Sequence, residues 1–285
     1  MKLSCLPVSF FSQITSGEMS LAQWAHMGSS VGLDAIDLSI LFIPDHSPEA
    51  LKRTRAEIEA EGMHVAMITS YPDFTHPHAD QRRCELDLEI EVVDVACQLG
   101  AALVRVTAGQ AHPQTGRQQG IEWASEGLTR LVEAIHGAGV TLVYENHAKP
   151  GAWEYTDFSQ PPEIFLEIVR RTAPVGLGIN FDTGNAAAFA EDPLAMLDQV
   201  IERVVSIHAS DTARRGFLQH VLLGTGVTPY AEIFARLKAS HWEGWICIEE
   251  ASGLGYAGVE AAAKYVRQTW DSAVTTCRRN RSSGV

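Results

Sequence analysis

The chain has 285 residues, of which 46% are hydrophobic and 20% charged, and its formal net charge is −13. This composition is typical of a globular protein with a sizeable apolar core. Because an acidic chain repels phosphate groups, the charge argues against nucleic-acid binding and against docking on anionic membranes. The apolar start, MKLSCLPVSFF, lacks the organisation of a secretion signal and is interpreted as a buried strand.

Short apolar runs alternate along the chain with longer amphipathic segments. The runs predict strands, in chain order, at 3–9, 35–39, 64–69, 103–107, 141–145, 176–182, 204–209 and 245–249. Apolar residues at three- and four-residue spacing predict helices at 48–61, 80–99, 121–137, 162–172, 193–201 and 230–240. In segment 80–99, the expected buried face consists of Leu86, Ile90, Val93, Ala96 and Cys97.

Eight strand–helix units of this kind favour parallel strands joined by right-handed crossovers. We therefore predict a single (β/α)8 TIM barrel over residues 1–285, with a frayed tail at about 272–285. An open doubly wound sheet would call for a phosphate-binding glycine loop after the first strand, and the SFFSQITSGEMS segment contains none. The five scattered cysteines form no CxxC pair, which favours a reducing, cytoplasmic location. No run of eighteen apolar residues predicts a membrane span.

Polar residues follow the last four predicted strands in the motifs YENH, NFDTGN, SIHASD and CIEE. These motifs place Glu145, Asp182, His208 and Glu249 at the carboxyl ends of the strands, which is where the active sites of TIM barrels lie. Taken singly, each residue could equally be a helix cap, a loop ion pair or a satisfied core histidine. Four of them at equivalent positions on consecutive strands favour a common site.

Three carboxylates that converge repel one another, by about 4 kcal/mol for two charges about 4 Å apart at an effective dielectric constant of about 20. A divalent cation reverses the sign of this interaction. Three oxygen ligands and one imidazole suit Mn²⁺, Mg²⁺, Co²⁺ or Zn²⁺. We expect one divalent ion, with Mn²⁺ as the first choice.

The four motifs, with DFTHP after the third strand and a later GTG, resemble those of the sugar phosphate isomerase/epimerase family of xylose isomerase-like TIM barrels. The resemblance extends roughly over residues 3–270, and the motifs are most similar to those of the D-tagatose and D-psicose 3-epimerases. It implies that Glu145, Asp182, His208 and Glu249 bind the metal ion. It also implies that Glu145 and Glu249 transfer protons on opposite faces of a sugar, through an enediolate beside a carbonyl.

The resemblance further implies that Arg214, six residues after His208, contacts substrate oxygens. One departure concerns the epimerase motif DxxH, because this chain has Asn185 where the epimerases have the histidine. Asparagine can form hydrogen bonds with a substrate but cannot carry its proton. The departure keeps open a second function, a lyase or dehydratase that acts on a 3-keto sugar, a keto-glycoside or a cyclitol at the same metal site.

Three further residues are candidates for substrate contacts. His147 should point the same way as Glu145, Arg105 ends the fourth strand, and His76 lies in a loop that could cover the site. Each has an alternative as a loop or ion-pair residue. An apurinic-site endonuclease has the same barrel but requires additional zinc-binding histidines and a basic surface, which this acidic sequence does not indicate. This function is therefore a remote third hypothesis. The expected partner is a small sugar or keto sugar, and relatives of this kind are often homodimers or homotetramers.

Overall fold

The structure is a computed structural model that describes residues 1–274. Residues 275–285, which include Cys277 and most of the predicted tail, lie outside the described part. Ser272, where that tail was expected to begin, is the last residue of a helix. Among residues 1–274, no helix combines the length and the apolar character that a membrane span requires.

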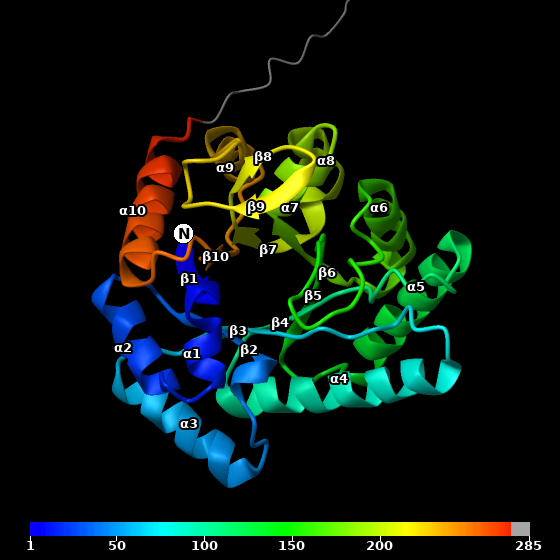
Figure 1. Cartoon of the computed structure of the whole chain (residues 1–285), viewed down its shortest axis with the longest axis horizontal. Helices are drawn as coiled ribbons and strands as arrows, with labels where there is room; N and C mark the ends of the chain where they lie inside the picture. The colour runs from blue at the N-terminus through cyan, green and yellow to red at the C-terminus, as the bar shows by residue number, and fades with distance from the viewer. Residues whose placement is uncertain (275–285) are drawn as a thin grey trace, which may run out of the picture.

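Eight parallel strands form one sheet that curls into a nearly closed barrel, with the helices arranged around it (Figure 1). The sheet has the strand order β1-β10-β7-β6-β5-β4-β3-β2. Backbone N–H groups of Asp34 and Ala35 donate to the carbonyl oxygen of Leu3 at 2.8 and 3.3 Å, which links β1 to the start of β2. The predicted TIM barrel is confirmed. Its strands are β1 (Lys2–Leu6), β2 (Ile36–Ser39), β3 (Val65–Thr69), β4 (Leu103–Val106), β5 (Thr141–Glu145), β6 (Gly178–Asp182), β7 (Val204–Ala209) and β10 (Trp245–Glu249).

The helices pack their apolar faces on the outside of the strands, and together they bury the main core. They are α1 (Phe11–Thr15), α2 (Leu21–Ser30), α3 (Pro48–Ala60), α4 (Ala79–Leu99), α5 (Arg117–Ala134), α6 (Pro162–Arg171), α7 (Thr183–Phe189), α8 (Pro193–Val200), α9 (Tyr230–Ala239) and α10 (Tyr256–Ser272). Short 3-10 helices cover Val8–Phe10, Ile40–Phe42, Ala173–Val175 and Ile201–Arg203.

A small antiparallel hairpin follows β7 and was not predicted. It consists of β8 (Thr212–Arg214) and β9 (Phe217–His220), and it lies beside α7 (Figure 1). The first predicted strand was too long, because β1 ends at Leu6 and the backbone turns into a 3-10 helix after Pro7. Proline has no N–H to donate to a sheet, which accounts for the early end.

The predicted buried face of α4 was partly wrong. Ile90 is 37% exposed, whereas its neighbour Glu89 is only 5% exposed. The Glu89 carboxylate accepts a hydrogen bond of 2.7 Å from Oγ of Ser70, at the end of β3. The buried face of α4 therefore includes a carboxyl group with a polar partner on the barrel, which hydrophobic spacing alone does not predict.

Replacing Glu89 with glutamine is expected to stabilise the fold at alkaline pH. Burial raises the pKa of Glu89 from 4.5 to about 8. Between these two values unfolding releases a proton, so the buried carboxyl group makes the free energy of unfolding fall as the pH rises. Glutamine keeps the shape and accepts the same bond without ionising. We expect a gain of about 3 kcal/mol at pH 9 and little change at pH 4, measured by urea unfolding.

The exposed Glu91, on the same helix, provides the matched control. Glu91→Gln should leave the free energy of unfolding unchanged within about 0.5 kcal/mol at both pH values. An equal effect of Glu89→Gln at pH 4 and pH 9 would show that ionisation of the buried carboxyl group is not the cause.

Candidate metal centre and active-site cavity

Inside the barrel, a layer of apolar side chains is followed by a layer of charged side chains nearer to the carboxyl ends of the strands. Met67, Leu103, Val143 and Cys247, from β3, β4, β5 and β10, form a small buried cluster of their own. Side chains two residues apart on a strand point to the same side. Arg105, Glu145 and Glu249 each stand two residues beyond a member of this cluster. Their side chains therefore also point into the barrel, nearer to the carboxyl ends of the strands.

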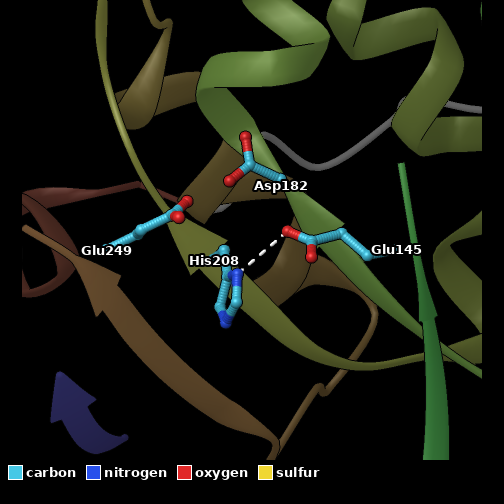
Figure 2. Close-up of side chains that lie close together, drawn as sticks. All are labelled: Glu145, Asp182, His208 and Glu249. Carbon is cyan, nitrogen blue, oxygen red and sulfur yellow. Dashed lines mark hydrogen bonds and ion pairs between the residues drawn. The ribbon is translucent and has the colours of Figure 1, made fainter. Parts of the chain in front are cut away.

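The four predicted ligands lie together at this end of the barrel. Glu145, Asp182, His208 and Glu249 each offer one ligand atom, and these atoms all lie within 4.8 Å of one another. Figure 2 shows the three carboxylates converging around the imidazole of His208. Nδ1 of His208 lies 2.9 Å from Oε1 of Glu145. The ends of β5, β6, β7 and β10 therefore present one compact set of donors.

Burial and the charges of neighbouring groups act on the ionisation of Asp182 and His208. Burial raises the pKa of Asp182 well above its ordinary value, and the nearby charges of Glu249 and Glu145 raise it further. Burial alone would lower the pKa of His208, but the charge of Glu145 and the hydrogen bond to it raise the pKa overall. A buried group of acids whose charges repel one another fits a divalent cation, which glutamate, aspartate and histidine can all ligate.

Neighbouring polar groups fix the orientation of Asp182. It caps the N-terminus of α7 by accepting a hydrogen bond from the backbone N–H of Asn185 at 2.5 Å. Oγ of Ser210 donates to both of its carboxylate oxygens at 3.0 and 3.1 Å. The side chain of Asn146 donates to the backbone carbonyl of Asp182 and accepts from its N–H, which ties β5 to β6.

Sequence reasoning missed Ser210 and Asn146 as supports of the site. Both stand next to the motif residues, in SIHASD and YENH, and their small polar side chains immediately after a strand were the only available signal. In metal sites generally, polar groups that form hydrogen bonds with a metal ligand fix the orientation of that ligand.

Arg105 is buried against Glu145. Its Nε lies 2.8 Å from Oε2 of Glu145, and its Nη1 donates to the backbone carbonyl of Ser70 at 2.9 Å. The guanidinium also lies over the ring of Tyr71, 4.7 Å from its centroid. Burial alone would raise the pKa of Glu145, but His208 and Arg105 together lower it to about 2. Glu145 therefore has both oxygens engaged by cationic or hydrogen-bonding neighbours.

A cavity of about 620 Å³ opens beside the cluster, at the carboxyl ends of the strands. Glu249 lines it, whereas Glu145 is fully buried and is not part of its wall. Three other predicted substrate residues, Arg105, His147 and Asn185, also line the cavity. The buried Nδ1 of His147 and Oδ1 of Asn185 have no hydrogen-bond partner within residues 1–274. These atoms are free to meet a ligand.

Two predicted substrate residues do not reach this cavity. Arg214 is exposed on the β8–β9 hairpin, where its guanidinium lies 5.3 Å from the ring centroid of Phe217. His76 lies in the loop after β3, with its ring 4.9 Å from that of His112, which is paired at 2.7 Å with Asp73. Neither lines the cavity wall. In this conformation their substrate contacts remain predictions without geometric support.

Comparison with known proteins also identifies a TIM barrel, and it identifies the family of the chain. A family model described as the xylose isomerase-like TIM barrel matches residues 27–271. A curated relative, an inosose dehydratase from Geobacillus thermodenitrificans (strain NG80-2), is 26% identical over 164 residues. That match covers 50% of this chain and 53% of the relative, so it spans about half the length of either protein.

Solved structures with diverse activities share the fold. The IolI protein, crystallised with a bound zinc atom, has a TM-score of 0.77 and 16% identity, covering 97% of this chain and 100% of the other. A probable 3-DHS dehydratase from Bacillus anthracis has a TM-score of 0.73 and 16% identity, with coverage of 94% and 99%. A D-tagatose 3-epimerase-like protein has a TM-score of 0.75 and 18% identity, with coverage of 95% and 97%. At these identities the structures establish the fold alone.

Proposed function

Because the chain belongs to the xylose isomerase-like TIM barrel family, we propose that it is a metal-dependent lyase that eliminates water or an alcohol from a keto sugar, keto-glycoside or keto cyclitol. The observation that carries this proposal is the asymmetry of the two glutamates. Only Glu249 faces the cavity, while Glu145 is buried and engaged by His208 and Arg105. This asymmetry supports a catalytic role for Glu249 and a structural role for Glu145.

This asymmetry bears on the choice between epimerisation and elimination. Epimerisation removes a proton from one face of a carbon and returns a proton to the opposite face, which calls for an acid–base group on each side. Elimination can proceed with a single group. The inosose dehydratase relatives support the same choice. The proposal thus favours the lyase or dehydratase that was the second function expected from the sequence, and a sugar isomerase or epimerase becomes the alternative.

The proposed metal ligands are Glu145, Asp182, His208 and Glu249. A divalent ion bound there would polarise a carbonyl group of the substrate and so acidify the neighbouring C–H bond. Manganese remains the first choice, and the zinc in the IolI structure is a property of that protein.

In the proposed reaction the carboxylate of Glu249 removes the proton from the carbon next to the carbonyl. The electrons of that C–H bond form a C=C bond while the C–O bond at the following carbon breaks. The departing oxygen takes up the proton from Glu249, so water or an alcohol leaves and an unsaturated ketone remains. We propose that His147, Asn185 and Arg105 bind the oxygens of the substrate.

The test is product analysis on metal-loaded enzyme. Inosose, a 3-keto-glucoside and a ketohexose should be incubated separately in D₂O and followed by ultraviolet absorbance, mass spectrometry and NMR. The proposal expects a conjugated enone whose mass is lower by that of water or the alcohol. A product of altered stereochemistry that keeps all its atoms, apart from one deuterium, would replace the lyase by an epimerase.

A further inference from the structure

The cavity beside Glu249 has a polar floor and mostly apolar outer walls. Four of its polar residues, Glu249, Arg105, His147 and Asn185, gather at the strand ends next to the metal ligands, and Lys149 and His220 line it from the segments beyond. Its apolar residues come mainly from the segments that follow the strands. They include Val8 and Phe11 after β1, Leu41 after β2, Trp153 after β5 and Leu218 in the β8–β9 hairpin.

The cavity is also too large for a single sugar ring. A hexose or cyclitol has about twelve non-hydrogen atoms, and at the roughly 30 Å³ that a water molecule occupies in the liquid it would fill no more than about 360 Å³. The cavity volume is about 620 Å³. Much of the space therefore lies against the outer walls, where apolar residues outnumber Lys149 and His220. Most hydroxyl groups of a second sugar would lose hydrogen bonds to water there without replacement.

We infer that these outer walls are a subsite for a flat, apolar substituent of the substrate, namely the aryl group of an aryl keto-glycoside. The inference deepens the proposed function and rests on it for the chemistry, but the binding itself can be tested separately. Phe11, Trp153 and Tyr71 supply aromatic surface, and aromatic rings prefer to pack on one another. Leu41 is 48% exposed, so part of the subsite is open to solvent and would be covered by the ligand.

For such a substrate the proposed elimination stays balanced. With the carbonyl at C3, Glu249 takes the proton from C2 and the C1=C2 double bond forms. The C1–O bond breaks, and the aryl group leaves as a phenol after its oxygen receives the proton. No oxidant or reductant is consumed in this step.

The test measures binding without turnover, using glucosides that lack the keto group and hence the acidic C–H bond. Methyl, phenyl and glucosyl β-glucosides should be titrated into Mn²⁺-loaded enzyme by calorimetry. Burial of about 100 Å² of ring surface at ~25 cal/mol per Å² makes the phenyl glucoside bind at least tenfold more tightly than the methyl glucoside. Equal affinity of these two ligands, or preference for the glucosyl ligand, overturns the subsite.

Variants of the wall provide the second measurement. Leu41→Gln with Leu218→Gln should reduce the phenyl-over-methyl preference to less than threefold while leaving the affinity for the methyl glucoside unchanged. Leu88→Gln, at an equally exposed leucine on α4, is the matched control and should keep the full preference. Circular dichroism checks folding, and Leu41→Gln alone serves if the double variant unfolds. An unchanged preference in the folded wall variants contradicts the inference.

The outcomes separate this inference from the proposed function. A phenyl preference without any enone from keto substrates would keep the subsite and reject the lyase. Enone formation from keto substrates without a phenyl preference would keep the lyase and reject the subsite.

Discussion

Replacing Glu249 with glutamine is expected to lower kcat by about 10²–10⁴-fold, the range associated with loss of a general base. Glutamine has nearly the same shape but cannot accept a proton from carbon at neutral pH. Glu249 is the one glutamate of the cluster that lines the cavity, so its loss should act on the chemical step. The measurement is kcat with saturating Mn²⁺ and a keto substrate identified by product analysis.

Two controls separate this base role from a role in metal binding or folding. Glu243→Gln changes an exposed acid shortly before the same strand and should retain full activity. Because Glu249→Gln also weakens one of the four proposed ligands, its affinity for Mn²⁺ should fall as well. Metal content is therefore determined on the same sample, and kcat is compared at an Mn²⁺ concentration at which one ion per chain is bound. Full activity of Glu249→Gln would remove Glu249 from the mechanism, and loss of activity only in proportion to lost metal would reduce it to a ligand.

The regular part of the barrel could be predicted because the strands carry a strong and repeated signal. The predicted ranges 141–145, 204–209 and 245–249 coincide with β5, β7 and β10. These strands are largely buried on both faces, as parallel sheets are, so they appear as mostly apolar runs with Glu145, His208 or Glu249 at or next to their end. The same end points placed the four clustered residues at one mouth of the barrel.

The features that the sequence did not predict depend on interactions between distant residues, which leave no local pattern in the sequence. The β8–β9 hairpin was missed because its strands have only three and four residues and turn at Gly216, whose φ of +81° suits glycine. Arg214 stands on this hairpin and is not among the residues that line the cavity, so the substrate contact that the resemblance implied stays a prediction. The polar floor of the site was predicted from its motifs, but its apolar walls were not. Leu41 lies in a 3-10 helix, Trp153 in a loop and Leu218 in β9, and the three share no sequence period.

Removal of the divalent ion should abolish turnover and also lower the thermal stability of the protein. The four donor groups lie within 4.8 Å of one another, and burial together with the charges of Glu249 and Glu145 raises the pKa of Asp182. A cation therefore relieves a cost of ionisation that the folded state otherwise carries. At a metal concentration a hundredfold above Kd, binding stabilises the native state by about 2.7 kcal/mol. Thermal unfolding with EDTA and with excess Mn²⁺ measures this difference. Mg²⁺, Co²⁺ and Zn²⁺ should be titrated in parallel.

The variant Asp182→Asn tests whether this stabilisation arises at the proposed centre. Asparagine keeps an oxygen that can cap α7 but removes one negative charge, so the metal-free variant should be no less stable than the metal-free parent. It should gain little from added Mn²⁺. Asp87→Asn, at an exposed acid on α4, should respond to the ion as the parent does. If Asp182→Asn were stabilised by Mn²⁺ as much as the parent, the ion would have to bind elsewhere, because three carboxylates sharing one cation cannot lose a ligand without losing affinity.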